Sequence, residues 1–256
     1  MRMRFKPYAR EELLACPFHA HAPLENRGRW AAQFARPGQP LHLELGCGKG
    51  GFLAQLASAH PEINYMGIDI TDKVLVLAKR KIEAAYAEKA LAPDNVFIMS
   101  LDIERIANAL TPEDQTDRIY INFCNPWNRK ASHKKHRLTH TRQLAAYRAF
   151  LRDGGEVYFK TDDDGLFADS LEYFPEAGYE VVWQTLDLHA EEPAWNIRTE
   201  HEGMFTAEGI PTKALIAKKL PVSEEALAAG LARRAAVEKA AAAARREAEV
   251  AGGAKG

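Results

Sequence analysis

Short apolar segments alternate with amphipathic ones through the middle of the chain. Residues 41–45, 63–68, 95–99 and 119–123 are each five or six residues long and rich in leucine, β-branched or aromatic residues, which is typical of buried strands. After the second of these segments, residues 73–88 carry apolar side chains at helical spacing. Strand and helix segments repeat at intervals of about 25 to 35 residues, which predicts a parallel, doubly wound sheet.

The alternation of strand and helix segments becomes less regular in the later part of the chain. Residues 156–160 continue the series of strands, and residues 166–173 are the next predicted helix. Strands are then predicted over 179–186 and 212–219, with a helical segment over 196–207 between them. Two late strands of this kind predict an antiparallel hairpin at one edge. The expected fold is therefore α/β, a doubly wound and mostly parallel seven-stranded sheet with an antiparallel edge hairpin.

The two ends of the chain differ from this pattern. Residues 1–40 contain five prolines and a basic cluster beside Trp30, and we interpret them as an arm packed on the core. Residues 221–256 are rich in alanine, the best helix former, so we expect a solvated terminal helix there. The predicted organisation is an N-terminal basic arm (1–40), an α/β domain (41–220) and an alanine-rich charged tail (221–256).

The overall composition narrows the class of protein but not its function. The 256 residues include 46% hydrophobic and 27% charged ones, with a net charge of -1, as in ordinary globular proteins. The three cysteines are far apart in sequence, which supports neither a disulfide framework nor a paired zinc motif and favours a reducing compartment. We find no apolar core of a signal peptide and no run of roughly 18 apolar residues. We therefore expect a cytoplasmic protein without a membrane partner.

A glycine-rich loop follows the first predicted strand. Gly46, Gly48 and Gly51 satisfy the spacing of a dinucleotide-binding loop, in which backbone N–H groups hold a pyrophosphate. Gly46, Gly48 and Gly50 form a second spacing of a glycine-rich loop, which fits equally well. Glu44 lies two residues before the first glycine, and its carboxylate would repel a pyrophosphate. This position suits a cationic ligand group instead.

Two further acids, Asp69 and Asp102, stand where the next two strands end. S-adenosylmethionine carries a sulfonium, an ammonium and two ribose hydroxyls but no phosphate. Asp69 is placed to accept hydrogen bonds from the ribose hydroxyls, and Asp102 from the adenine amino group. Together with Glu44 and the glycine loop, these acids predict a site for S-adenosylmethionine. The alternative is that each acid only caps the helix that follows it.

The strand over residues 119–123 leads through Asn125 and Trp127 into residues 129–142, which we call the basic segment. The segment contains six Lys or Arg residues and three His residues but no acid. The lack of balancing acids favours contact with phosphates over an ordinary solvated surface. Lysines and arginines lie between the histidines, and their charge argues against zinc, so we expect no metal site.

These motifs together resemble the bacterial tRNA (guanine-N7-)-methyltransferases, a family of class I S-adenosylmethionine-dependent methyltransferases. The similarity extends over residues 1–220, and its motifs are specific rather than generic. The alanine-rich tail lies outside it. The matching stretches are Met1-Arg2-Met3-Arg4 with Lys6-Pro7, Leu43-Glu44-Leu45-Gly46-Cys47-Gly48-Lys49-Gly50, Gly67-Ile68-Asp69, Asn122-Phe123-Cys124-Asn125-Pro126-Trp127, His133-Lys134-Lys135-His136-Arg137-Leu138, Phe159-Lys160-Thr161-Asp162 and Thr199-Glu200-His201-Glu202.

The resemblance implies roles for individual residues. Asn125 and Asp162 are implied as the catalytic residues. The methyl donor would be bound by Glu44, Gly46, Gly48, Asp69, Asp102 and Asn125. The substrate would be contacted by Arg129, Asp162, Thr199, Glu200, His201 and Glu202. RNA would be contacted by Lys130, His133, Lys134, Lys135, His136 and Arg137.

The sequence departs from the family pattern at three places. Asn125 replaces a usual Asp, Asn128 replaces a usual Pro, and Ala131-Ser132 stands where one Arg is common. Guanine N7 carries a lone pair and no proton, so its attack on the methyl carbon needs no general base, and we expect an active enzyme. Asn125 can orient the donor or the base through hydrogen bonds, but it cannot offset the positive charge that develops on the imidazole ring.

The resemblance implies transfer of a methyl group from S-adenosylmethionine to guanine N7 in tRNA, at position 46 of the variable loop. Asp162 would select guanine, because a carboxylate accepts from N1–H and the 2-amino group together. We expect Asp163 or Asp164 to cap the next helix. The alternatives are a class I methyltransferase acting on another substrate and an RNA-binding protein that no longer catalyses. The expected partner is tRNA, and the expected state is a monomer or a homodimer.

Overall fold

Eight strands form one sheet in the computed structural model, which describes the backbone of residues 7–253 and the side chains of residues 7–247. Their order across the sheet is β1-β4-β3-β2-β5-β6-β8-β7. Neighbouring strands are parallel except where β8 pairs with β6 and with β7. The strands are β1 (His19–Ala20), β2 (Leu41–Leu45), β3 (Asn64–Asp69), β4 (Val96–Ser100), β5 (Thr116–Asn122), β6 (Leu151–Thr161), β7 (Tyr179–Thr185) and β8 (Lys213–Lys219).

The parallel sheet and the antiparallel edge predicted from the sequence are both confirmed. β8 runs antiparallel between β6 and β7, with Val181 of β7 opposite Ala217. The sheet has one strand more than the seven predicted, because β1 comes from the N-terminal arm. His19 of β1 lies opposite Ile98 of β4 in a parallel pair. Two residues are too short to show a periodic pattern, so the sequence carries no signal for this strand.

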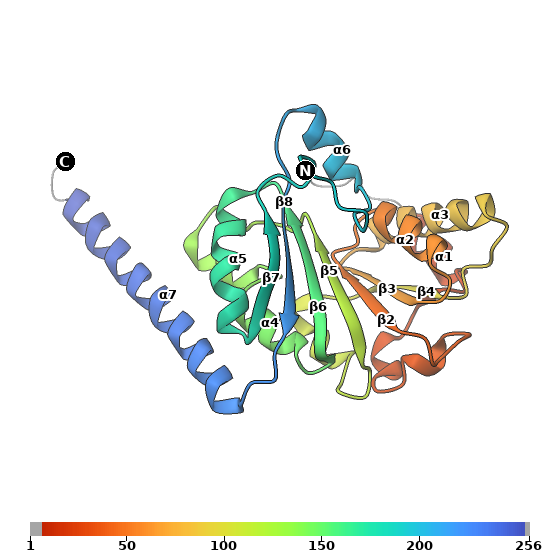
Figure 1. Ribbon diagram of the computed structural model, residues 1–256, viewed down its shortest axis with the longest axis horizontal. Coiled ribbons are helices and arrows are strands. Elements are labelled where there is room, and N and C mark those ends of the chain that lie inside the picture. The colour runs from red at the N-terminus through yellow and green to blue at the C-terminus, as the bar shows by residue number, and fades with distance from the viewer. Residues whose placement is uncertain (1–6, 254–256) are drawn as a thin grey trace.

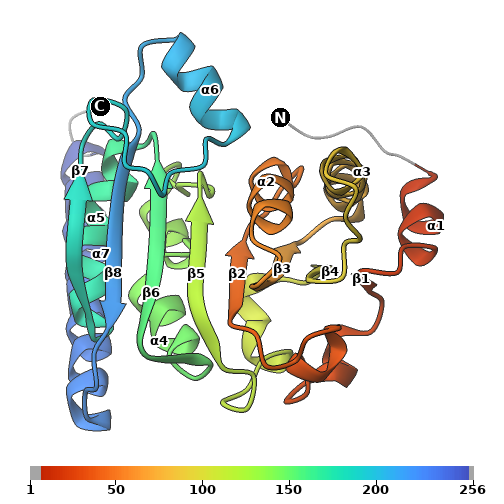
Figure 2. The same ribbon diagram turned by 45° about the vertical axis from the view of Figure 1, so that its right-hand side comes forward.

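Helices cover both faces of the sheet (Figures 1 and 2). α1, α2 and α3 pack together on one face, and α4, α5 and the beginning of α7 pack on the other. Within the described residues, no helix combines the length and the apolar character that crossing a membrane requires. The helices are α1 (Ala9–Leu14), α2 (Gly51–Ala59), α3 (Asp72–Glu88), α4 (Thr141–Tyr147), α5 (Asp164–Glu176), α6 (Glu200–Ala207) and α7 (Glu224–Gly253), with short 3-10 helices η1 (Pro23–Asn26), η2 (Ala31–Gln33), η3 (Ile103–Asn108) and η4 (Ala131–His136).

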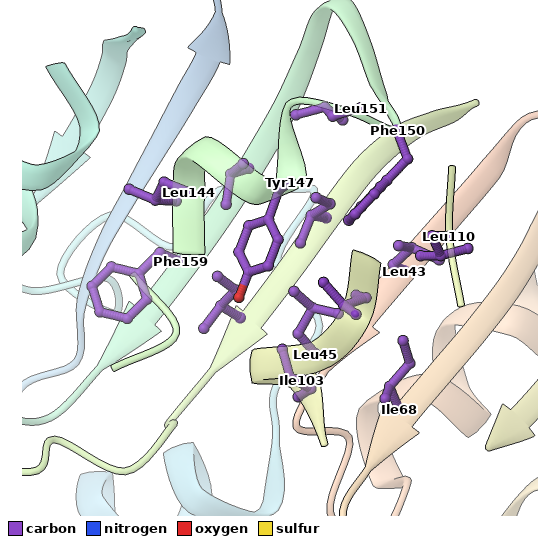
Figure 3. Close-up of a cluster of buried hydrophobic side chains, with 14 of the residues drawn as sticks. Leu43, Leu45, Ile68, Ile103, Leu110, Leu144, Tyr147, Phe150, Leu151 and Phe159 are labelled. Atoms are coloured by element: carbon purple, nitrogen blue, oxygen red, sulfur yellow. The ribbon is translucent and has the colours of Figure 1, made fainter. Parts of the chain in front are cut away.

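Alternate strand residues fill two hydrophobic layers, one on each face of the sheet. Leu43 and Leu45 of β2 belong to the layer under α4 and α5, as do Ile119 and Ile121 of β5. Tyr120, between the last two, belongs to the layer under α2 and α3. Figure 3 shows Leu144, Tyr147 and Phe150 in the first layer, together with Leu43 and Leu45 of β2. Each fully buried side chain of this size contributes about 1.5–3 kcal/mol to stability.

The structure contains the predicted C-terminal helix, but one side of the first half of α7 packs on the domain and is not solvated. A Cβ at Gly230 would overlap the carbonyl oxygen of Glu176, so α7 lies very close to the end of α5. Arg234 forms ion pairs with Glu172 and Glu176, both at 2.8 Å. Beyond Glu238 the side chains are exposed as far as residue 247. The first half of α7 thus packs on the domain, and the second half extends away from it (Figure 1).

Gly230→Ala tests this close approach. The added methyl group would displace Glu176 or lift α7, so we expect the free energy of unfolding in urea to fall by about 1–3 kcal/mol. Gly203→Ala is the matched control, because this glycine is also helical but has no atom within 4 Å of the added methyl group. Alanine should stabilise α6 there by about 0.5–1 kcal/mol. Equal effects of the two substitutions would contradict close packing of α7 on α5.

Candidate active site

A cavity of about 600 Å³ opens at the carboxyl ends of β2, β3, β4 and β5. These four strands are neighbours in the sheet, so side chains that end or follow them come together at one edge. All of the residues that the sequence assigns to the methyl donor line this cavity: Glu44, Gly46, Gly48, Asp69, Asp102 and Asn125.

The glycine loop between β2 and α2 forms one wall of the cavity. Gly46 N and Cys47 N donate to the carbonyl oxygen of Ile68 at 2.9 and 3.0 Å, which ties the loop to β3. Gly46 and Gly48 have φ values of +81° and +52°, a left-handed conformation that favours glycine. A Cβ at Gly48 would meet no atom within 4 Å. The loop therefore borders open space with its backbone.

Glu44 is the most deeply buried acid of the cavity, with 3% of its surface exposed. Its Oε1 accepts from Asn122 Nδ2 at 3.1 Å, whereas its buried Oε2 accepts no hydrogen bond from the described residues. Burial raises the pKa of Glu44 to about 8, although the Asn122 amide and the charge of Lys160 act in the opposite direction. A cationic donor group in the cavity would satisfy Oε2 and stabilise the carboxylate.

Asp69 and Asp102 reach the cavity from different local structures. Asp69 accepts from Gly48 N at 3.0 Å and from Thr71 N at 3.3 Å, and burial raises its pKa. The N-cap of α3 is Thr71, not Asp69. Asp102 is the N-cap of η3 and accepts from a backbone N–H two residues later at 3.1 Å. Asp102 therefore caps a helix in addition to lining the cavity, whereas Asp69 caps none.

The cavity fits S-adenosylmethionine better than a dinucleotide. The unpaired Oε2 of Glu44 requires a hydrogen-bond donor, and an ammonium group supplies one. A pyrophosphate at the glycine loop has no hydrogen-bond donor to offer Oε2 of Glu44 and would be repelled by the carboxylate of Asp69. The glycine loop and the acids match a ligand that carries a cation and hydroxyl donors.

β5 leaves the sheet through an irregular turn that carries Asn125. Phe123 and Trp127 have φ values of 51° and 47°, which is uncommon for residues other than glycine. Asn125 Oδ1 accepts from Trp127 N at 3.0 Å and stabilises the turn. The ring of Trp127 lies 6.0 Å from that of His133 and 5.2 Å from that of His136, measured between centroids. The turn therefore joins the donor cavity to the basic segment.

Two residues of α6 that are predicted to contact substrate, Glu200 and His201, line the cavity. The ring of His201 stacks on that of Phe123, with centroids 5.7 Å apart. Glu200 is paired with Lys81 of α3 and lies 3.9 Å from Lys49 of the glycine loop. These contacts hold α6 at the carboxyl end of the sheet (Figure 2).

The other two predicted substrate residues of this segment, Thr199 and Glu202, anchor α6. Glu202 has no exposed surface, and its carboxylate accepts from Lys160 Nζ at 2.6 Å. Thr199 N donates to Glu202 at 2.7 Å, and Glu202 N donates to Thr199 Oγ1 at 3.1 Å, which forms a capping box. In this structure Glu202 therefore anchors α6 and has no exposed surface, and its role as a substrate contact stays a prediction. Thr199 lines the cavity, but its hydroxyl is engaged in the cap.

The basic segment meets acids that lie elsewhere in the sequence. Lys134 Nζ is 2.5 Å from Asp169 of α5, and Arg137 pairs with the same carboxylate. Arg137 is only 1% exposed, and it also donates to the carbonyl oxygen of Pro126 at 2.6 Å. Arg137 therefore supports the turn after β5 in this structure, and its role as an RNA contact stays a prediction.

The remaining residues predicted to contact RNA keep access to solvent. Lys130 and Lys135 are exposed, and their side chains form no hydrogen bond or ion pair with the described residues. His133 and His136 are partly buried beside Trp127. Across the part of the chain that the structure describes, no three His, Cys, Asp or Glu side chains gather in a way that could hold a metal ion.

Asp162 and Arg129, the other predicted substrate contacts, lie outside the donor cavity. The carboxylate of Asp162 has no hydrogen bond or ion pair with the described residues, whereas Asp163 caps α5 as predicted, accepting from a backbone N–H at 2.6 Å. Arg129 lines a second cavity, of about 340 Å³, whose walls include Asn125 and Trp127. Because Asn125 and Trp127 also line the donor cavity, the two cavities share a wall.

Sequence reasoning does not single out two residues that organise the site, Asn122 and Lys160. Asn122 donates to Glu44, and Lys160 holds Glu202. Both lie at the carboxyl end of an apolar strand, in β5 and β6. A polar residue at the end of a buried strand is a signal that could have found them, because such a residue needs a partner inside the protein.

The fold and the cavity define a class I S-adenosylmethionine-dependent methyltransferase. Residues 38–215 match a family described as putative methyltransferase. A relative from Clostridium perfringens strain SM101, named tRNA (guanine-N(7)-)-methyltransferase, is 57% identical over 220 residues, which are 86% of this chain and 100% of the relative. A relative of the same name from Clostridium beijerinckii is 55% identical over 219 residues, 86% of this chain and 99% of the relative. The chain belongs to the tRNA (guanine-N7-)-methyltransferase family.

A comparison with solved structures agrees on the fold. The crystal structure of the 16S rRNA methyltransferase KamB aligns with a TM-score of 0.50 and 15% identity, and the alignment covers 86% of this chain and 96% of that one. At this identity the similarity concerns the fold alone.

Glu44→Gln should change how stability depends on pH in the protein without donor. The folded state holds a proton on Glu44 up to about pH 8, whereas the unfolded chain releases it near the ordinary value of 4.5. The free energy of unfolding of the unmodified protein should therefore fall as pH rises between these values, and that of the variant should fall less. Urea denaturation at pH values across this interval measures the difference.

Glu88→Gln, at an exposed position of α3, is the control for loss of one carboxylate. Its stability should follow that of the unmodified protein at every pH. If the stability of Glu44→Gln also followed that of the unmodified protein at every pH, Glu44 would not retain its proton on folding.

Proposed function

We propose that this chain methylates guanine 46, in the variable loop of tRNA, with the donor in the cavity at the ends of β2, β3, β4 and β5. The broader activity follows from family membership: the chain is an enzyme that transfers the methyl group of S-adenosylmethionine to N7 of a guanine in tRNA. The family resemblance supports the position in the variable loop. One observation carries the proposal. Glu44, Asp69 and Asp102 line a cavity, and His136 of the basic segment lines the same cavity.

We assign donor binding to the acids and glycines of the cavity. The unpaired Oε2 of Glu44 would accept from the ammonium group, and Asp69 would accept from the ribose hydroxyls. Asp102 would accept from the adenine amino group. The positive φ and open space at Gly48 would let the donor approach the backbone of the loop. When bound, S-adenosylmethionine supplies an electrophilic methyl carbon on its sulfonium.

The chain has to align the methyl donor with the target guanine, and it has no proton to remove from guanine N7. Guanine N7 carries a lone pair, so the attack needs no general base. Favourable alignment of reacting groups can contribute about 7–11 kcal/mol. Asn125 lies in the wall that the donor cavity and the second cavity share, where its amide would orient the donor or the guanine.

We assign the target guanine to the second cavity, which Arg129 lines, and its recognition to Asp162. The unpaired carboxylate of Asp162 would accept from N1–H and the 2-amino group of guanine, a pair of donors that selects this base. Glu200 and His201 would border the target from α6. The tRNA backbone would be contacted by Lys130, His133, Lys134, Lys135 and His136, all of which retain exposed surface.

We further propose that the protein acts in the cytoplasm as a monomer or a homodimer. We divide the chain into an arm (1–40), a methyltransferase domain (41–220) and a tail (221–256). Strands β2 to β8 all lie within the second of these ranges, and α7 begins after it, which supports the boundaries.

The proposed position is tested with labelled donor and unmodified tRNA, followed by cleavage at N7-methylguanine. We expect one site of incorporation, at guanine 46, and no incorporation into the same tRNA with adenine at that position. Incorporation at another guanine would overturn the position alone. Incorporation at another atom, or none, would favour a methyltransferase of different specificity or an RNA-binding protein without activity.

Asp162→Asn tests the assignment of guanine recognition. The amide places an N–H donor opposite a donor of the base, so kcat/KM for tRNA should fall by about 10- to 100-fold while donor affinity stays unchanged. Asn125→Asp is the contrasting variant, because a carboxylate can accept from Trp127 N as the amide does. Its activity should be similar or higher. Equal loss of donor affinity and turnover in Asp162→Asn would contradict a role in recognising the base.

A further inference from the structure

A groove of about 950 Å³ lies between the basic segment and the exposed half of α7. We call it the basic groove. It shares no lining residue with the donor cavity. Six of the basic residues on its two walls are Arg129, Lys130 and Lys135 on the side of the basic segment, and Lys239, Arg245 and Arg246 on α7.

One face of α7 forms the second wall of the groove, opposite the basic segment. Residues Arg234, Val237, Ala241 and Arg245 all line the groove and recur at helical spacing. A helix face that packs on a domain carries large apolar side chains, but beyond Val237 the groove lining is alanine, lysine, arginine and one glutamate. The alanines are small enough to leave the groove open to a ligand.

The charge of the groove is strongly positive. Its walls carry eight basic and three acidic side chains. Within the described residues, the six cations named above form no side-chain hydrogen bond or ion pair. Excess charge of one sign in a concave surface attracts a polyanion. Each acid has a partner within the chain: Asp169 pairs with Lys134, Glu172 pairs with Arg234, and Glu238 is hydrogen-bonded to His140.

The groove is continuous with the region where the methyl transfer would take place. Arg129 lines both the groove and the second cavity, and the second cavity shares Asn125 and Trp127 with the donor cavity. A strand of RNA with one base at the reacting centre can therefore pass over Arg129 into the groove. Between Arg234 and Arg246, α7 extends this surface by about 18 Å, at 1.5 Å per residue.

We propose that the basic groove binds backbone phosphates of the tRNA outside the nucleotide that is methylated. This inference rests on the proposed function. The family match ends at residue 215, whereas α7 begins at Glu224. The helix is thus an addition to the family domain. Its ion pairs with α5 and its hydrogen bond with His140, the N-cap of α4, hold it where its cations face those of the basic segment.

Two triple variants with the same change in net charge test this role. The groove variant loses three positive charges through Lys239→Gln, Arg245→Gln and Arg246→Gln. The control variant gains three negative charges on the other side of α7 through Ala229→Glu, Ala232→Glu and Ala240→Glu. These alanines are exposed, do not line the groove and do not lie three or four residues from Lys239, Arg245 or Arg246. Circular dichroism of the full chain checks that α7 remains helical in both.

The affinity for unmodified tRNA is measured over a range of KCl concentrations. Each phosphate that the groove no longer neutralises should make the slope of log affinity against log salt shallower by about 0.7–0.9, so the slope of the groove variant should be shallower by about 2 to 3. Its affinity near physiological salt should fall about tenfold or more. The control variant should keep the slope of the unmodified protein. At saturating tRNA, kcat should be unchanged in both variants, because neither touches the reacting centre.

Equal slopes for the groove variant and the unmodified protein would overturn this inference and leave the proposed function intact. Failure of the unmodified protein to methylate tRNA would overturn the proposed function instead. The binding slopes would then still decide whether the groove holds RNA phosphates, because they do not depend on turnover.

Discussion

The parallel pairing of β2 between β3 and β5 is the constraint on which the site depends. In this register Glu44 lies opposite Gly67 on one side and Tyr120 on the other. Glycine at position 67 lets Leu53 and Cys47 pack against the strand, because a Cβ there would meet side-chain atoms of both. Strand residues alternate between faces, so a slip of one residue would turn Glu44 away from the cavity and into the hydrophobic layer under α4. The acceptors of the donor site are thus positioned by backbone pairing.

A second determinant is the buried ion pair between Lys160 and Glu202. Lys160 Nζ also donates to Asn196 Oδ1 and to the carbonyl oxygen of Ile197, both at 3.0 Å, so its ammonium group is well satisfied. Buried ion pairs contribute little net stability, because desolvation offsets much of the attraction, but this one specifies where α6 begins. The same ammonium acts to lower the pKa of Glu44. The placement of α6 and the charge of the donor site are therefore linked.

The basic segment shows why a count of charges is a poor guide to a binding surface. Asp169 engages Lys134 and Arg137, and Glu104 lies 2.6 Å from His136. These pairs hold the backbone of the segment against η3 and α5, so the cations without partners are presented from a defined position. The same reasoning applies to α7, where Arg234 is used for packing and the more distal cations remain exposed.

By itself, the sequence determined the alternation of strands and helices, the antiparallel edge and the acids at three successive strand ends. These features follow from local periodicity and from the rule that parallel strands end at one edge of the sheet. Only the tertiary structure decided the strand β1, the burial of Arg137 and Glu202, and the packing of the first half of α7. Each of these depends on a partner far away in the chain, and a local pattern of residues contains no information about which distant group will neutralise a charge or receive a strand.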